Sequence, residues 1–157
     1  LGNQQSPFDA WQTMQGVESL PMRMDRHCEN AMTVAEFLED HPDVAWVTYP
    51  GLESHETHDM ASKYLDGGYG GMIAFGLAGG YDAAKTTVES TEIASLLANV
   101  GDAKTLVIHP ASTTHQQLTE AEQEAAGVTA DMVRLSVGTE NVEDIVADLD
   151  QAIGQAD

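Results

Sequence analysis

Met-Val-Arg-Leu-Ser-Val, residues 132–137, is the stretch on which the architecture of this 157-residue chain depends. Its side chains alternate between apolar and polar, which is the period of a strand with one buried face. Arg134 falls on the opposite face from Val133 and Leu135. A helix capped by Asn141 is expected directly afterwards, because apolar residues then recur at helical spacing. Strand and helix together predict a sheet packed against helices on one side.

Other apolar runs predict strands at residues 44–49, 72–77 and 104–108, whereas residues 93–98 fit a strand or a helix equally well. Short helices are predicted at residues 56–65, 81–89 and 120–126. This order of elements predicts an α/β chain of the α+β type, with a largely antiparallel sheet that is covered by helices and preceded by a long helix.

The N-terminal region predicts two consecutive helices. Ser6 is the expected cap of the first, and Pro21 should kink or end it. The second helix should stop before Pro42. Its expected buried stripe consists of Met24, Cys28, Ala31, Ala35 and Leu38.

The charge of the chain is unusual. Twenty-six acidic residues face six lysines and arginines, which gives a formal net charge of -20, while the hydrophobic content of 42% is ordinary. Such a surface repels nucleic acid and anionic membranes, so both are disfavoured as partners. The acids are spread along the chain, and molar salt would screen them by shortening the Debye length to about 3 Å. We therefore expect a halophilic source with a salty cytoplasm.

The sequence also bears on the cellular compartment of the protein and on whether the chain is a fragment. The single cysteine, Cys28, excludes an internal disulfide and fits a reducing, cytoplasmic compartment. No apolar run approaches the roughly 18 residues that a membrane span needs. Because the chain opens with Leu1 rather than methionine, we expect a fragment or a processed piece.

Three polar clusters suggest chemistry only weakly. His55 and His58 lack the spacing of the zinc-protease motif and a third ligand, which favours an exposed loop. The serine and histidines of residues 109–115 suggest a hydrolase, but the glycine-flanked nucleophile elbow is missing. The glycines of residues 67–71 precede a strand, so a turn is favoured over a phosphate cradle.

Arg134 is more informative, because it is the only lysine or arginine after Lys104. A planar guanidinium can bind a carboxylate through two parallel hydrogen bonds. On composition alone, a structural ion pair with one of the many acids is favoured. Binding of a carboxylate ligand is the alternative.

Several long stretches resemble the Cys/Met-metabolism family of pyridoxal-phosphate (PLP) enzymes, nearly from end to end and in the family's order. The most specific are residues 96–104 (LLANVGDAK), 107–115 (VIHPASTTH) and 134–140 (RLSVGTE), supported by residues 23–31 (RMDRHCENA) and 49–52 (YPGL). The first two stretches look most like the O-acetylhomoserine sulfhydrylase branch.

The resemblance implies the C-terminal small domain of a fold-type I PLP enzyme. Residues 1–41 would be a connecting helical segment and residues 42–157 the substrate-binding domain, without the large PLP domain. For the full-length enzyme, it implies PLP as cofactor, a small-molecule amino-acid substrate and a homo-oligomer. Arg134 would grip the substrate's α-carboxylate, Asn99 would lie beside it, and Thr114 would line the site.

In this family, the lysine that forms a Schiff base with PLP lies in the large domain. Lys63, Lys85 and Lys104 do not lie in its motif, so the resemblance implies no catalytic or cofactor-binding residue in this chain, which alone is expected to be inactive. The implied reaction replaces the acetate of O-acetylhomoserine with sulfide or methanethiol, giving homocysteine or methionine. The alternatives are a cystathionine γ-synthase or γ-lyase on the same scaffold, and a non-catalytic interaction or regulatory domain.

Overall fold

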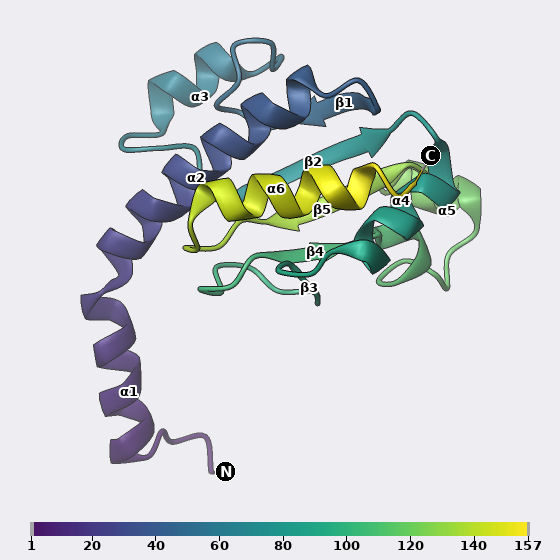
Figure 1. Ribbon diagram of the computed structural model, residues 1–157. Helices are drawn as coiled ribbons and strands as arrows, with labels where there is room; N and C mark the ends of the chain where they lie inside the picture. The colour runs from purple at the N-terminus through teal and green to yellow at the C-terminus, as the bar shows by residue number, and fades with distance from the viewer. Residues whose placement is uncertain (1, 157) are drawn as a thin grey trace.

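A computed structural model describes residues 2–156 and shows one five-stranded sheet (Figure 1). The strand order is β1-β2-β5-β4-β3, and every neighbouring pair is antiparallel except β3 and β4. The predicted largely antiparallel sheet is therefore confirmed. The strands are β1 (Val44–Thr48), β2 (Met72–Leu77), β3 (Ser95–Leu96), β4 (Leu106–Ile108) and β5 (Met132–Ser136).

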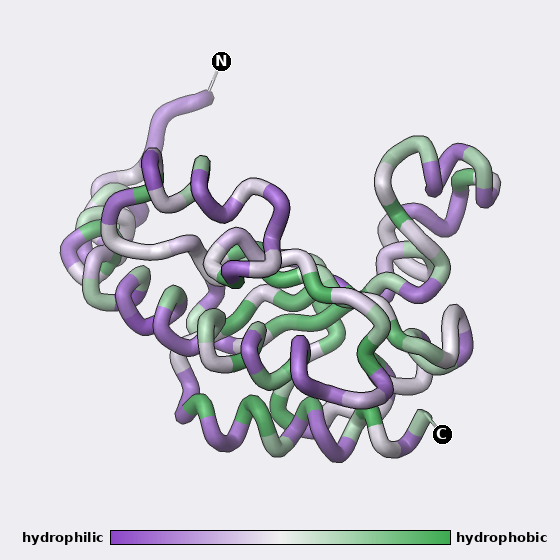
Figure 2. Tube along the Cα trace, turned by 90° about the horizontal axis from the view of Figure 1, so that it is seen from above, coloured by the Kyte–Doolittle hydropathy of each residue, from purple (hydrophilic) through white to green (hydrophobic). Residues whose placement is uncertain are grey.

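Three helices cover one side of this sheet, which we call the helix face, and the opposite side is the far face. They are α2 (Leu20–Asp40), α4 (Gly80–Ser90) and α6 (Val142–Ile153). In Figure 1, α6 crosses the sheet and packs against both other helices. Figure 2 shows the hydrophobic strands enclosed by chain of more polar character. The predicted helical cover is confirmed.

The alternation predicted for β5 is confirmed. Val133 and Leu135 are fully buried on the helix face, opposite Phe75 and Ile73 of β2. Both strands also contact α4, and Ile145 and Leu149 of α6 belong to the same core cluster. Arg134 points to the far face, where the strand register places it between Ala74 and Ile108.

The N-terminal helices divide where Pro21 predicted. The first, α1 (Pro7–Glu18), begins at Ser6, whose hydroxyl accepts a hydrogen bond from the Asp9 amide. It buries no residue and projects away from the sheet (Figure 1). Helix α2 ends at Asp40, before Pro42.

The buried stripe of α2 differs from the prediction at its N-terminal end. Met24 is 37% exposed and Cys28 is half-buried, while His27 and Asn30 are buried in their place. These two polar side chains face the segment that follows β5, so polar contacts replace apolar packing there. The predicted stripe is correct for Ala31, Ala35 and Leu38, which lie in the core. The domain boundary after residue 41 stays a prediction, and α2 packs on the sheet beyond it.

The remaining elements are short. Helix α3 (His58–Tyr64), the 3-10 helix η1 (Pro110–Ser112) and α5 (Glu120–Ala125) lie in the connections. The ambiguous residues 93–98 form the two-residue strand β3. Gly127 follows α5 with a φ of 77°, a left-handed conformation that favours glycine at a helix end. Within residues 2–156, no helix is long and apolar enough to cross a membrane.

Candidate substrate-binding site

Arg134 lies on the far face of β5. It is half-buried between two apolar neighbours in the register, Ala74 and Ile108. The ion pairs of the described part of the chain involve Arg26, Lys85 and His41, and none involves Arg134. The structural ion pair that composition favoured is therefore not formed among residues 2–156. The guanidinium also forms no side-chain hydrogen bond among the described residues, and its role as a carboxylate-binding residue stays a prediction.

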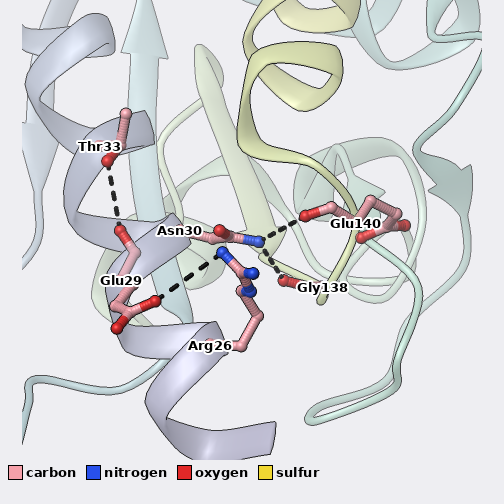
Figure 3. A network of polar contacts seen from close by, with 6 residues as sticks. All are labelled: Arg26, Glu29, Asn30, Thr33, Gly138 and Glu140. Atoms are coloured by element: carbon pink, nitrogen blue, oxygen red, sulfur yellow. Dashed lines mark hydrogen bonds and ion pairs between the residues drawn. The ribbon is translucent and has the colours of Figure 1, made fainter.

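The segment after β5 is held by two side chains of α2. His27 Nδ1 lies 2.7 Å from the carbonyl oxygen of Val137. A carbonyl only accepts hydrogen bonds, so Nδ1 carries the proton and donates it. The Asn30 amide donates to the carbonyl oxygens of Gly138 and Glu140, at 3.0 and 2.9 Å (Figure 3). These bonds fix the chain directly beyond the strand that carries Arg134.

Glycine is required at position 138 because the backbone of Lys104 and Thr105 approaches it closely. A Cβ at this position would lie 2.4 Å from the Thr105 nitrogen and 2.5 Å from the Lys104 carbonyl carbon. The Gly138 amide donates to Thr105 Oγ1 at 2.9 Å, and that hydroxyl donates to Glu140 Oε2 at 2.9 Å. Glu140 Oε1 also accepts from the Thr105 amide at 2.7 Å. The turn after β5 is thus locked onto the start of β4.

Asn99 lies in an exposed loop between β3 and β4, where its side chain accepts a hydrogen bond from the Val100 amide. The following residues, Val100 and Gly101, turn back towards the sheet. They line a cavity of about 70 Å³ together with Ser136 of β5, Met72 of β2 and the buried ring of His27. Thus the loop carrying Asn99 and the strand carrying Arg134 meet at one small cavity.

Thr114 is the third predicted site residue. It is exposed after η1, and its hydroxyl lies 2.9 Å from Nδ1 of the neighbouring His115. No hydrogen bond among the described residues joins Thr114 to Arg134 or to Asn99. The three predicted site residues therefore lie on three separate segments, two of which the cavity brings together.

The Ser/His cluster has a structural role. His109 is fully buried, and its Nε2 lies 2.8 Å from the carbonyl oxygen of Ala130. This nitrogen therefore carries the proton, and Nδ1 accepts from the Ser112 hydroxyl at 2.8 Å. The ring of Tyr81 packs edge-on against the imidazole. The pair holds the loop before Thr114 and offers no exposed nucleophile.

No lysine of this chain is placed to hold an aldehyde cofactor as an imine beside Arg134. All three are exposed. Lys63 lies over the ring of Tyr64, Lys85 pairs with Glu89 at 4.0 Å, and Lys104 lies outside the cavity lining. That this chain contains no cofactor-binding residue stays a prediction.

The sequence did not reveal the roles of four polar residues that hold the segments around the predicted site residues: His27, Asn30, Glu140 and Asp148. For three of these residues, the sequence contains a pattern that could have indicated a structural role. His27 and Asn30 lie beside the apolar stripe of α2, and Asp148 interrupts that of α6. A polar residue on a buried helical stripe must find hydrogen-bond partners, although sequence alone does not say which.

Comparisons with known proteins identify the family of this chain. The profile of the family described as "Cys/Met metabolism PLP-dependent enzyme" matches residues 1–154. An O-acetyl-L-homoserine sulfhydrylase of Leptospira meyeri is 55% identical over 98% of this chain and 35% of its own length. A homocysteine synthase of Schizosaccharomyces pombe is 53% identical, over 98% and 36%. The chain thus spans about a third of the length of these relatives.

Another relative, an L-methionine gamma-lyase of Fusobacterium nucleatum, is 49% identical over 94% of this chain and 37% of its own length. A crystal structure from Campylobacter jejuni, described as an O-acetylhomoserine (thiol)-lyase with a pyridoxyl-lysine group, superposes with a TM-score of 0.91. It is 44% identical and covers 98% of this chain and 36% of that one. This chain therefore belongs to the Cys/Met-metabolism family of PLP-dependent enzymes.

Proposed function

We propose that this chain is the C-terminal, substrate-binding part of a PLP-dependent O-acetylhomoserine sulfhydrylase. The observation that carries the proposal is Arg134, a half-buried guanidinium on the far face that has no ion-pair partner among the described residues. Such a fork suits the α-carboxylate of an amino-acid substrate. PLP, which supplies the electron sink, and the lysine that holds it would belong to a part of the protein outside this chain.

Asn99 and Thr114 complete the proposed site. Val100 and Gly101 of the Asn99 loop line one cavity with Ser136 of β5, which supports a place for this loop near Arg134, although neither Asn99 nor Arg134 lines the cavity itself. Thr114 projects from a neighbouring loop that the buried His109 holds in place. Their roles are secondary to that of Arg134, because neither side chain carries the charge that a carboxylate requires.

The activity is tested on the full-length protein, supplied with O-acetylhomoserine and sulfide or methanethiol. Formation of homocysteine or methionine is the expected result. The isolated chain is mixed with PLP in parallel and should show no stoichiometric aldimine absorption after gel filtration, because its lysines are exposed and lie outside the cavity. A retained aldimine band would contradict the proposed division of labour.

A γ-lyase is the second candidate, since the L-methionine gamma-lyase of Fusobacterium nucleatum is nearly as similar as the sulfhydrylases. Both reactions need the same α-carboxylate contact, so Arg134 does not separate them. Release of a thiol from methionine without a sulfur donor would favour the lyase. A full-length protein inactive on both substrates would favour the non-catalytic alternative.

We also propose a homo-oligomer in a salty cytoplasm. The support for the salty environment is the net charge of -20, because salt screens repulsion between surface carboxylates. The melting temperature should therefore rise from low to molar potassium chloride. A melting temperature that stays flat or falls would contradict the halophilic assignment, and sedimentation of the full-length protein would test the oligomer.

A further inference from the structure

The segment that carries Asn99 leaves the sheet at β3 (Ser95–Leu96) and returns at β4, which begins at Leu106. Leu96 at the end of β3 is 51% exposed, and the loop residues Leu97 and Val100 are 53% and 65% exposed. A loop with so little apolar burial would move unless its ends were fixed. The base is closed by a hydrogen bond of 3.0 Å from the Ser95 amide to the Thr105 carbonyl oxygen.

The first end of the loop is fixed by Asp148 of α6. This carboxylate is 4% exposed and accepts hydrogen bonds from three consecutive backbone amides, those of residues 92, 93 and 94, at 2.7, 3.0 and 2.9 Å. Gln151 donates to it from the next turn of the helix at 3.1 Å. A buried carboxylate with no cation beside it is costly to desolvate, so these four donors are what make its burial possible.

The second end is fixed by Glu140 and Thr139. Glu140 accepts from both the amide and the hydroxyl of Thr105. The amide and the hydroxyl of Thr139 both donate to the Ala103 carbonyl oxygen, at 2.8 and 3.1 Å. These residues lie in the turn that follows β5, so this end of the loop is tied to the strand that carries Arg134.

We propose that Asp148 and Glu140 are positioning residues for substrate binding, which hold the two ends of the Asn99 loop in place beside the end of β5. The inference rests on the proposed function, because it assigns the loop to the α-carboxylate subsite. Neither carboxylate touches the substrate. Each acts through backbone groups at one end of the loop, which sets the position of Asn99 relative to Arg134.

Asp148→Asn is the sharpest substitution, because it keeps the shape of the side chain. Both carboxylate oxygens accept from backbone amides, so either orientation of the asparagine places an amide donor against another donor. Asp131→Asn is the matched control. Asp131 holds Trp46 at the opposite edge of the sheet by a hydrogen bond of 2.7 Å and has no bond to the loop. Glu140→Gln is the milder variant at the other end.

Hydrogen exchange in the full-length protein tests the anchoring without any need for activity. Amides of residues 95–104 should exchange at least about tenfold faster in Asp148→Asn than in wild type. In Asp131→Asn, their exchange rates should equal those of the wild type. Glu140→Gln should give a smaller acceleration, confined to residues 102–105. Unchanged exchange of the loop in both Asp148→Asn and Glu140→Gln would overturn the proposal.

Steady-state kinetics then test the positioning role. Asp148→Asn should raise the KM for the amino-acid substrate by about three- to tenfold with kcat little changed, whereas Asp131→Asn should leave KM unaltered. In the Asn99→Ala background, Asp148→Asn should have almost no further effect on KM, because both changes remove one interaction. Additive effects would overturn the proposal. Absence of wild-type activity would instead refute the proposed function, and hydrogen exchange would still decide the anchoring.

Discussion

The two faces of β5 differ in how deeply their side chains are buried. On the helix face, Val133 and Leu135 are fully buried against β2 and the helical layer. On the far face, Arg134 and Met132 are only half-buried, and the guanidinium has no ion-pair partner among residues 2–156. Neighbouring residues of one strand thus separate side chains whose burial packing explains from a cation that packing does not explain. A half-buried charged side chain that forms no ion pair with the described residues is the better indicator of function.

The largest effect is expected on the helix face. Leu135→Ala should lower the free energy of unfolding by about 2–5 kcal/mol, because it leaves a cavity between Ile73 and the helices. Thermal unfolding measures the loss. Activity per folded molecule should change little, since the side chain lies on the opposite side from Arg134. A stable variant with impaired KM would show that the two faces are not independent.

Arg134 should show the converse behaviour. A charge-assisted hydrogen bond contributes about 1.5–3 kcal/mol, so Arg134→Ala should lower kcat/KM of the full-length enzyme at least about tenfold, mainly through KM. Arg134→Lys should recover little, because lysine keeps the charge but lacks the planar fork. The melting temperature should stay near that of the wild type. Normal kinetics with a lowered melting temperature would restore the structural interpretation.

Much of this fold could be predicted from the sequence, because its signals are local. The alternation of β5, the proline before β1 and the cap at Ser6 each act within a few residues. The anchoring of the site could not be predicted. Asp148 binds amides more than 50 residues away, and Asn30 bonds to Gly138 across 108 residues. Such contacts depend on tertiary packing, on which helical spacing and local propensity carry no information.

Two buried threonines extend the comparison to hydroxyl groups. Thr87 of α4 and Thr105 before β4 are both fully buried, but only Thr105 has hydrogen-bond partners among the described residues. Replacing Thr105 with valine should cost about 1–3 kcal/mol, because the Gly138 amide and Glu140 lose a partner. The same change at Thr87 removes an unpaired hydroxyl and should stabilise by up to about 1 kcal/mol. Equal effects at both positions, measured by urea unfolding, would contradict the assignment.

The smallest effect on stability is expected in α5. This helix has no buried residue, so local hydrogen bonds rather than packing stabilise it. Thr119 donates its amide and its hydroxyl to Glu122 Oε2, both at 2.8 Å. The backbone bond is the main cause that holds the pKa of Glu122 below its ordinary value of 4.5, with the hydroxyl bond second.

Because the folded-state pKa of Glu122 is the lower one, the capping bonds stabilise α5 fully above pH 4.5, and this contribution is lost as the pH falls through the folded-state pKa. Hydrogen exchange of the α5 amides should accelerate in this acidic range, while the melting temperature of the whole domain hardly changes, since the helix buries nothing. Glu122→Gln keeps an acceptor oxygen for the cap but cannot titrate, so its α5 amides should lose this pH dependence. A carboxyl resonance of Glu122 that titrates at or above 4.5 would show that the capping bonds do not form in solution, and α5 would then depend on packing as the helix face does.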